Sequence, residues 1–359
     1  TVQKSVLQTL ADLSRQERIA IILITHDMGV VSEMCDYVYV LRHGMLVEKG
    51  LTRSVMLEPR AKYSQELMAS VPRIDKRFDR FDVPETGKKT ENLAALSYLY
   101  SKGRDQKITG EPLLEVKRLS KTFVTPGTLF RPSSEFQAVK EVSFDICQGE
   151  TVGIVGESGS GKSTIGRMIL GLQDISGGEI WYKGNDISKT KDRLIWHEDC
   201  LSMQCIFQDP FSSLNPRMTA SENITYALRV RKLVDRRKTQ QLARDLLALV
   251  GLEPADAQKL PNAFSGGERQ RIGIARALAL QPDFIFCDEP TSSLDVSVQA
   301  RFLNLLKDLQ KEFSLTLLFV SHDLAVIRQM CDRVVVMKDG EALEQGTNDD
   351  IFEHPQHHY

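Results

Sequence analysis

The feature that most constrains the fold of this 359-residue chain is a glycine-rich loop between an apolar strand and a helical run. Thr151–Val155 has the composition of a short buried strand, and Ile165–Leu170 that of a helix. The loop between them reads Gly156-Glu157-Ser158-Gly159-Ser160-Gly161-Lys162-Ser163-Thr164. This spacing predicts a phosphate-binding loop, because glycines let backbone amides curl toward an anion at a helix N-terminus. A glycine-rich turn with a chance lysine is the alternative interpretation.

Two acidic residues supply the other half of a nucleotide site. The apolar run Phe284–Cys287 leads into Asp288 and Glu289. Lys162 is expected to reach the β- and γ-phosphates, and Ser163 to coordinate Mg²⁺ through its hydroxyl. A buried strand that ends in carboxylates suits this chemistry, since Asp288 would hold the metal and Glu289 would orient and deprotonate the attacking water. An acidic strand end that faces solvent is the alternative.

The chain also contains one complete and one partial copy of a repeat. Residues 1–63 align without a gap on residues 297–359, and 19 of the 63 positions are identical. We therefore expect 1–63 to be the C-terminal remnant of a first domain, 64–111 a solvated linker, and 112–359 a second, nearly complete domain. The sequence reads as a fragment of a tandem protein, cut at both ends. The apolar run Ile19–Ile24 has the composition of a buried strand. We nevertheless expect 1–63 to be loosely held, with the apolar surface of this run exposed and in need of a covering surface.

Several further motifs in the second copy resemble those of ABC ATPases. Phe264-Ser265-Gly266-Gly267-Glu268 resembles the signature motif of that family, and Ser265 lies 23 residues before Asp288. Four other motifs of that family have counterparts here. Phe123 matches the adenine-stacking aromatic, Gln208 the Q-loop, Ser293-Leu294-Asp295 the D-loop, and His322 the switch histidine. The resemblance covers essentially all of 112–359 and, as a partial copy, 1–63, where His26 takes the place of His322.

The resemblance implies that two such domains close over two nucleotides. Ser265, Gly266 and Gly267 would cap an ATP bound to the opposite domain, and Asp295 is counted with the nucleotide-binding residues. Phe123 would stack on the adenine, a plain core phenylalanine being the alternative.

It also implies a catalytic group of three residues. His322 would contact the γ-phosphate and its water, a satisfied core histidine being the alternative. Gln208 would touch Mg²⁺ or that water and report to a membrane partner. Together with Glu289, these residues would carry hydrolysis.

The fold implied by the resemblance is an α/β P-loop NTPase fold. It combines a RecA-like core, an antiparallel β subdomain and an α-helical subdomain at about residues 209–263. The apolar spacing over Thr239–Val250 predicts an amphipathic helix there. The six basic residues within Arg229–Lys238 read as a solvated surface, a nucleic-acid patch being the lesser alternative.

Two stretches indicate one branch of the family. Gln208–Thr219 resembles the peptide and nickel uptake branch of ABC importers, which includes oligopeptide, dipeptide and glutathione systems. The tail His354–Tyr359 resembles that branch's HPxHPY motif, with His358 in place of the proline; a metal site formed by the tail histidines is the lesser alternative. Glu268 stands where the signature more commonly has glutamine, which could weaken closure, but we still expect an active site.

The function implied is ATP hydrolysis, with ATP and Mg²⁺ as cofactors, that powers peptide import. Two integral-membrane permease subunits and a solute-binding protein would be the partners, and ABC domains would pair through the tandem copy or as a homodimer. The chain would be peripheral, at the cytoplasmic face of a bacterial inner membrane. A soluble tandem ABC ATPase resembling translation factors, which needs a long charged helical linker, and an exporter are the alternatives. The transported solute is not specified by the sequence.

Composition argues against several other classes. The formal net charge of −2 provides no bulk attraction to nucleic acid or anionic membranes. No apolar run approaches the roughly 18 residues of a membrane helix. The six cysteines form no CxxC pair, which favours reduced thiols over a disulfide framework.

Overall fold

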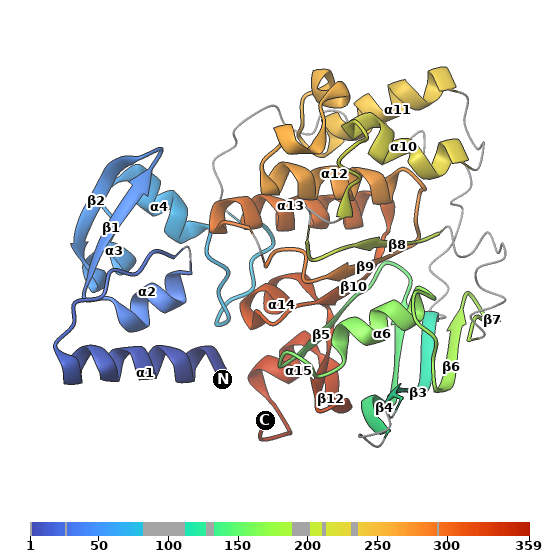
Figure 1. Ribbon diagram of the computed structural model, residues 1–359, viewed down its shortest axis with the longest axis horizontal. Coiled ribbons are helices and arrows are strands. Elements are labelled where there is room, and N and C mark those ends of the chain that lie inside the picture. The colour runs from blue at the N-terminus through green and yellow to red at the C-terminus, as the bar shows by residue number, and fades with distance from the viewer. Residues whose placement is uncertain are drawn as a thin grey trace. The chain divides into compact units, whose positions relative to one another are not determined.

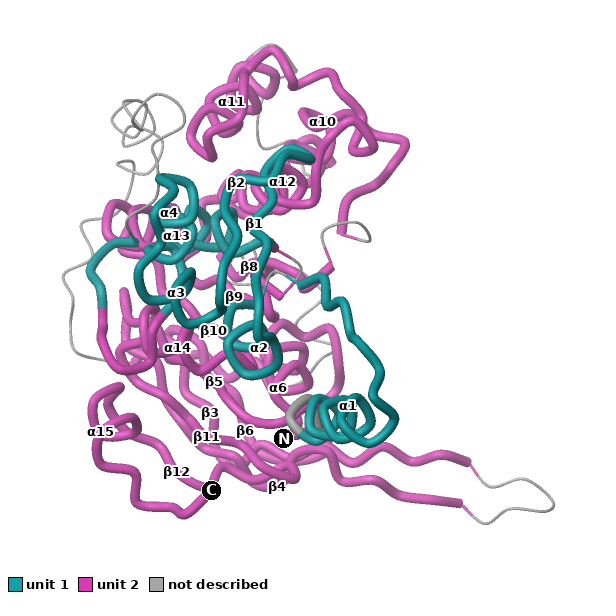
Figure 2. The backbone as a smooth tube through the Cα atoms, turned by 90° about the vertical axis from the view of Figure 1, so that its left-hand side faces the viewer, with its two compact units in different colours: residues 1–72, 78–86, 295–304 teal, residues 73–77, 87–294, 305–359 magenta. Residues whose placement is uncertain are grey.

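The computed structural model describes residues 2–25, 27–81, 112–126, 133–188, 202–209, 213–230, 236–292 and 294–359. The chain forms two compact units (Figure 2). The first comprises 1–72, 78–86 and 295–304, and the second 73–77, 87–294 and 305–359. This grouping differs from the proposed division at residues 63 and 111, which stays a prediction.

A six-stranded sheet forms the centre of the second unit (Figure 1). Its order is β12-β11-β5-β10-β9-β8, and only β12 is antiparallel to its neighbour. The strands are β5 (Thr151–Gly156), β8 (Met203–Ile206), β9 (Phe284–Asp288), β10 (Thr316–Val320), β11 (Arg333–Lys338) and β12 (Glu341–Thr347). All residues of β9 and β10 are buried, which explains why these strands read as continuous apolar runs.

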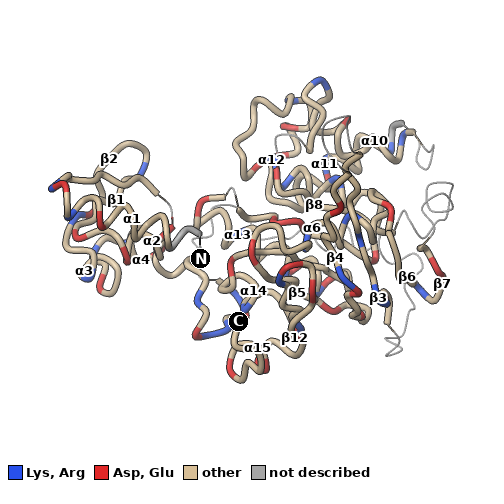
Figure 3. Tube along the Cα trace, turned by 60° about the horizontal axis from the view of Figure 1, so that its bottom comes forward, with Lys and Arg blue, Asp and Glu red and all other residues tan. Residues whose placement is uncertain are grey.

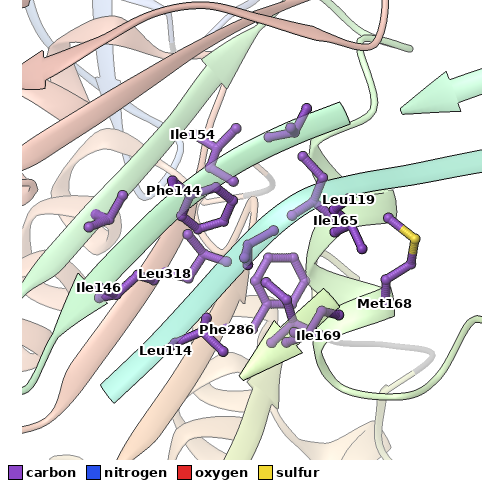
Figure 4. Close-up of a cluster of buried hydrophobic side chains, with 14 of the residues drawn as sticks. Leu114, Leu119, Phe144, Ile146, Ile154, Ile165, Met168, Ile169, Phe286 and Leu318 are labelled. Atoms are coloured by element: carbon purple, nitrogen blue, oxygen red, sulfur yellow. The ribbon is translucent and has the colours of Figure 1, made fainter. Parts of the chain in front are cut away.

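A four-stranded antiparallel sheet packs on this core. Its order is β4-β3-β6-β7, with bounds Ser134–Cys147, Pro112–Thr125, Gly177–Tyr182 and Asn185–Asp186. Helix α6 (Lys162–Ile169) contributes its buried face to the same hydrophobic cluster as both sheets (Figure 4). Its Ile165, Met168 and Ile169 lie among Leu114 and Phe286, all of them essentially inaccessible to solvent. The phosphate loop is thus attached to a helix whose inner face is part of the hydrophobic core.

The remaining helices complete the predicted P-loop architecture. Helices α10 (Ala220–Val230), α11 (Arg236–Leu249) and α12 (Gly266–Leu278) pack on one another as a helical subdomain, together with the short turns η1 (Pro254–Gln258) and η2 (Pro261–Ala263) (Figure 1). The amphipathic helix predicted from its leucine spacing lies in α11. The others are α13 (Val296–Phe313), α14 (Leu324–Met330) and α15 (Asn348–Glu353). The α/β fold with antiparallel and helical subdomains is therefore confirmed.

The first unit contains one two-stranded sheet among its described residues. Its elements are α1 (Val2–Glu17), α2 (Met28–Met34), β1 (Tyr37–Arg42), β2 (Met45–Leu51), α3 (Thr52–Leu57) and α4 (Lys62–Ala69). Strands β1 and β2 repeat the pairing of β11 and β12 at an offset of 296, including the irregularity, which falls after Val40 in one pair and after Val336 in the other. Asp27 and Asp323 likewise cap α2 and α14 with the same pair of hydrogen bonds.

The expectation that Ile19–Ile24 forms a buried strand is wrong. These residues have no regular structure, and Ile22 and Ile24 are 92% and 94% exposed. The corresponding run in the second copy is β10, which is fully buried and pairs with β5 on one edge and with β9 on the other. A strand of this composition is stable only when both of its neighbours are present, and the described part of the first unit supplies neither.

The predicted linker begins inside α4, and a described part of it is tightly bonded. The buried amide of Gln329 donates to the carbonyl oxygens of Arg73 and Lys76 at 2.7 and 2.5 Å. In the first unit, the buried Asn304 donates to the Phe81 carbonyl oxygen and accepts from its N–H, at 3.0 and 2.9 Å. Because these amides are buried, the linker backbone satisfies part of their hydrogen-bonding capacity. Parts of the predicted linker thus bond to buried side chains, although residues 73–77, 79 and 80 are themselves exposed.

Three general properties bear on the class of protein. No helix within the described ranges is long and apolar enough to cross a membrane. The five cysteines that the structure describes are free thiols. Basic and acidic residues are interspersed along the trace (Figure 3).

We predict that Gly166→Ala destabilises the protein. A Cβ at this position would lie 2.0 Å from a ring carbon of Phe286, which is itself fully buried. Overpacking a core costs about 1–3 kcal/mol, more than the roughly 1 kcal/mol of helix propensity that alanine gains. Thermal unfolding should show a lower transition temperature. Gly273→Ala, in α12, is the matched control, because its added Cβ meets no atom within 4 Å; equal unfolding temperatures for the two variants would contradict the prediction.

We also predict that residues 1–63 are cleaved first in limited proteolysis. Arg15 precedes the exposed Ile19–Ile24 run, whereas Lys311, which aligns with Arg15 in the repeat, precedes the buried β10. Trypsin should therefore cut after Arg15 well before it cuts after Lys311, as followed by mass spectrometry. Equal resistance of 1–63 and 112–359 would disprove the expectation that the first copy is loosely held.

Candidate nucleotide-binding site

The phosphate loop follows β5 and leads directly into α6. Gly156, Gly159 and Gly161 have φ angles of 151°, 85° and 99°, in the region that side-chain-bearing residues rarely adopt. A Cβ on Gly156 would lie 2.1 Å from the Met337 carbonyl oxygen, and one on Gly161 would lie 2.5 Å from that of Ala138. Glycine is thus required at both positions by backbone conformation and by space.

Lys162 lies folded over this loop. Its Nζ donates to the carbonyl oxygens of Gly156 and Glu157 at 2.8 and 2.7 Å. Burial lowers the pKa of the ammonium, and the carboxylates of Glu289 and Asp288 oppose that shift. A positive charge held by neutral carbonyls is well placed to exchange them for phosphate oxygens.

Ser163 and Asp288, two of the three predicted metal ligands, are in contact, whereas Gln208, the third, bonds to Glu289. Ser163 Oγ donates to Asp288 Oδ1 at 2.6 Å, and Arg167 Nη2 lies 3.9 Å from the same carboxylate. Burial raises the pKa of Asp288, while the Ser163 hydrogen bond and the Arg167 charge lower it. A hydroxyl and a buried carboxylate are oxygen ligands of the kind that Mg²⁺ takes.

The three predicted catalytic residues meet at one carboxylate oxygen. Glu289 Oε2 accepts a hydrogen bond from Gln208 Nε2 at 3.0 Å and lies 3.2 Å from His322 Nδ1. The His322 hydrogen bond lowers the pKa of Glu289, and the same bond raises the pKa of His322. Glu289 has a φ of 45°, a left-handed conformation that costs about 1–3 kcal/mol at a non-glycine residue. Its N–H donates to Val320 of β10 at 3.0 Å, which holds this conformation in place.

Gln270 is a site residue to which the sequence motif assigns no role. It is 2% exposed, and its Nε2 donates to the carbonyl oxygens of Pro290 at 2.9 Å and Phe207 at 3.4 Å. These carbonyls belong to the neighbours of Glu289 and Gln208. Gln270 therefore joins the signature helix α12 to both segments that carry the catalytic group. The sequence pattern that could have indicated this residue is its position on the buried face of α12, four residues after Gly266.

The signature residues open α12. Ser265 is the N-cap: its Oγ accepts weakly from Glu268 N–H at 3.4 Å, while its N–H and Oγ both donate to Glu268 Oε2 at 2.8 Å. This capping box satisfies the first turn of the helix. The hydrogen bond from the Ser265 backbone lowers the pKa of Glu268, so this carboxylate is charged beside the serine.

The other predicted binding residues belong to several elements. Phe123 is on β3, where its register partner is Phe136, and Lys121 Nζ lies 5.2 Å from its ring centroid. It is 38% exposed, so it is not a core phenylalanine. Asp295 belongs to the first unit and precedes α13. The remaining ones are Ser158 and Ser160 in the loop, Thr164 in α6, and Gly266 and Gly267 in the first turn of α12.

Some sequence predictions cannot be placed or find no support. His26, Pro210–Ser212 and Ser293 lie outside the described residues. The described residues, including His354, His357 and His358, contain no group of three histidine, cysteine, aspartate or glutamate side chains placed to hold a metal.

The site fits a nucleotide with Mg²⁺. The cradle is closed to any Cβ at Gly156 and Gly161, a lysine ammonium lies over the loop, and a hydroxyl and a carboxylate meet at its end. Backbone amides at a helix N-terminus with a neighbouring lysine suit phosphates. The paired oxygens suit the metal.

Comparisons with known proteins agree with this geometry. The ABC transporter family profile matches residues 139–292. The glutathione import ATP-binding proteins GsiA of Pectobacterium atrosepticum (strain SCRI 1043) and Escherichia coli (strain K12) are 39% and 40% identical to the chain. The alignments cover 100% of this chain and 58% of each relative, so the chain spans little more than half the length of these proteins.

Solved structures extend the likeness to the fold. The ATP-binding cassette MJ0796, in a dimeric post-hydrolysis state bound to ADP and Pi, is 32% identical, with a TM-score of 0.57. That comparison covers 66% of this chain and 98% of MJ0796. CbiO1 from Clostridium perfringens, part of the ABC transporter complex CbiONQ, gives the same TM-score at 26% identity. Given the phosphate loop, the carboxylates that follow β9 and this likeness over an entire cassette, the chain belongs to the ABC transporter family of ATP-binding cassettes.

Proposed function

We propose that this chain binds and hydrolyses ATP and thereby powers the import of a peptide-type solute through a membrane permease. The observation that carries the proposal is the meeting of Gln208, Glu289 and His322 at one carboxylate oxygen, immediately after the strand that carries Asp288. The geometry supports it: the Glu289 carboxylate, kept ionised by the His322 hydrogen bond that lowers its pKa and held by Gln208 and His322, can orient the attacking water and accept its proton.

The chain's own residues divide the hydrolytic work. Backbone amides of the loop and the Lys162 ammonium bind the phosphates, and Lys162 gives up its contacts with two loop carbonyls in return. Ser163 and Asp288 would hold Mg²⁺, and Gln208, which donates to Glu289 at 3.0 Å, would contact the metal or the water. Bound Mg²⁺ supplies charge neutralisation of the phosphates. Glu289 accepts the proton of the attacking water. His322 contacts the γ-phosphate and that water.

Closure of two cassettes completes the site. Ser265, at the N-terminus of α12, would reach an ATP held by a second cassette, supplied by a tandem domain or by a second copy of the chain. The dimeric state of MJ0796, a cassette matched over 98% of its length, supports this pairing. ATP drives the change because it binds the closed pair better than the open one.

The solute class follows from the relatives. Both compared relatives are named for glutathione import, and glutathione is a short peptide. We infer a peripheral subunit at the cytoplasmic face of a bacterial inner membrane, with two permease subunits and a solute-binding protein as partners.

Purification of the full protein from solubilised membranes should recover two polytopic chains. Recovery of ribosomes, or of no membrane protein, would favour a soluble tandem ATPase.

We predict that Glu289→Gln abolishes turnover and traps a dimer with MgATP. The glutamine keeps the size of the side chain but cannot take the proton from water, so hydrolysis should fall by at least about 100-fold, the lower range for losing a general base. Gel filtration with light scattering should then detect a dimer with MgATP and a monomer with MgADP. Glu253→Gln, an exposed carboxylate in the helical subdomain, is the control and should keep full turnover. A strictly monomeric Glu289→Gln variant would contradict closure through this site.

A further inference from the structure

Helix α12 carries one buried amide on an otherwise apolar inner face. Gln270 is 2% exposed, and the other buried residues of this helix are Ile272, Gly273, Ile274, Ala275, Ala277 and Leu278. Burying an amide costs free energy unless its donors are satisfied, whereas an apolar side chain at the same place would carry no such cost. Packing alone therefore does not explain this glutamine.

Both of its hydrogen-bond acceptors adjoin the catalytic group. Gln270 Nε2 donates to the Pro290 carbonyl oxygen at 2.9 Å and to that of Phe207 at a longer 3.4 Å. Pro290 follows Glu289 in the chain, and Phe207 precedes Gln208. The side chains of Gln208 and Glu289 are themselves hydrogen-bonded at 3.0 Å. One amide thus spans the two main-chain segments whose side chains meet.

These two segments leave the central sheet as neighbours. Strands β8 and β9 are parallel, and their register runs from Met203 with Phe284 to Ile206 with Cys287. The catalytic residues lie beyond the last of these pairs, where this strand pairing no longer sets the spacing of the two segments. The hydrogen bonds of Gln270 join the segments at this point, and α12 packs against β8 (Figure 1).

Helix α12 bonds to the segment of Gln208 at a second point. Arg276, six residues after Gln270 on the same helix, donates from Nη1 to the Ser213 carbonyl oxygen. The helix is therefore bonded to the chain on both sides of Gln208. A shift of the signature helix would move this segment with it.

The backbone at Glu289 requires support from its surroundings. Its φ of 45° is in the left-handed region, and such a conformation persists only where neighbouring groups hold it. The N–H of Glu289 donates to Val320, and its carbonyl oxygen accepts from Ser292 Oγ at 3.1 Å. Gln270 binds the next carbonyl, that of Pro290. Strand, turn and signature helix therefore each hold one part of the segment that directs the carboxylate.

We propose that Gln270 is a positioning residue of ATP hydrolysis, which holds Gln208 and Glu289 together and ties both to the signature helix. The inference rests on the proposed function, because it assumes that this pair acts on the attacking water. Gln270 touches neither nucleotide nor water in this role. Its loss should therefore lower kcat, with little effect on the affinity of the phosphate loop for MgATP.

A second buried glutamine provides a matched control. Gln329, on α14, is fully buried, and its Nε2 also donates to two main-chain carbonyl oxygens, those of Arg73 and Lys76. Neither acceptor adjoins a residue of the proposed site. Methionine has a similar length but cannot donate, so replacing either glutamine by methionine should lower stability. Only the change at Gln270 should also reach the catalytic pair.

The test compares Gln270→Met with Gln329→Met in the full chain. Thermal unfolding measures stability, titration with a fluorescent ATP analogue and Mg²⁺ measures Kd, and steady-state hydrolysis below both unfolding transitions measures kcat. Both variants should unfold at a lower temperature than the unmodified chain. We expect Gln270→Met to lower kcat at least about tenfold, within the range for misplaced catalytic groups, and to change Kd less than about twofold. Gln329→Met should leave kcat and Kd unchanged.

Two further variants make the test independent of how well Gln270→Met folds. Gln270→Asn retains an amide but withdraws it by one methylene, so it should also lower kcat. Combined with Gln208→Ala, Gln270→Asn should lower kcat by less than the product of the two single effects, because both changes disturb one pair. Unchanged kcat in the Gln270 variants, an equal loss in Gln329→Met, or fully multiplicative effects overturn the inference. Absence of ATP hydrolysis in the unmodified chain overturns the proposed function instead.

Discussion

The contact between the backbone of α6 and the Phe286 ring sets the geometry on which the nucleotide site depends. Gly166 lies one helical turn after Ser163, and Phe286 lies two residues before Asp288, so their close approach fixes how far the helix stands from the strand. The 2.6 Å distance between Ser163 Oγ and Asp288 Oδ1 follows from it. Two segments far apart in the chain thereby present their oxygens together, and the burial around them keeps that distance rigid.

The charged groups of the site are each held by a neighbouring polar or charged group. Lys162 is bound by loop carbonyls, Asp288 by Ser163, and Glu289 by Gln208 and His322. In the proposed function each of these groups would exchange its present partner for a phosphate oxygen, Mg²⁺ or water. Binding would then not uncover buried charges, which would keep its desolvation cost low. Glu289 has a left-handed backbone conformation, which is strained for a residue with a side chain. This strained conformation sets the direction of its carboxylate.

Most of the core and the loop could be predicted from the sequence, because apolar runs and glycine spacing report local structure directly. The phosphate loop, β9 and the helical subdomain follow from such patterns. What failed depended on partners remote in the chain. Ile19–Ile24 has the composition of a buried strand, but composition cannot show whether neighbouring strands are present. Gln270 and Gln329 act through backbone carbonyls of other segments, and a carbonyl is available at every residue, so no side-chain pattern indicates these contacts.

The segment at 73–81 also determines where the second cassette can be separated from the rest of the chain. Its carbonyl and amide groups complete the hydrogen bonding of two buried side chains, Gln329 and Asn304. A recombinant cassette that starts at residue 112, where the first strand begins, would leave both amides without these partners inside the protein. We therefore expect a separately expressed cassette to be more stable when it starts ahead of residue 73, some forty residues upstream of the first strand of that unit.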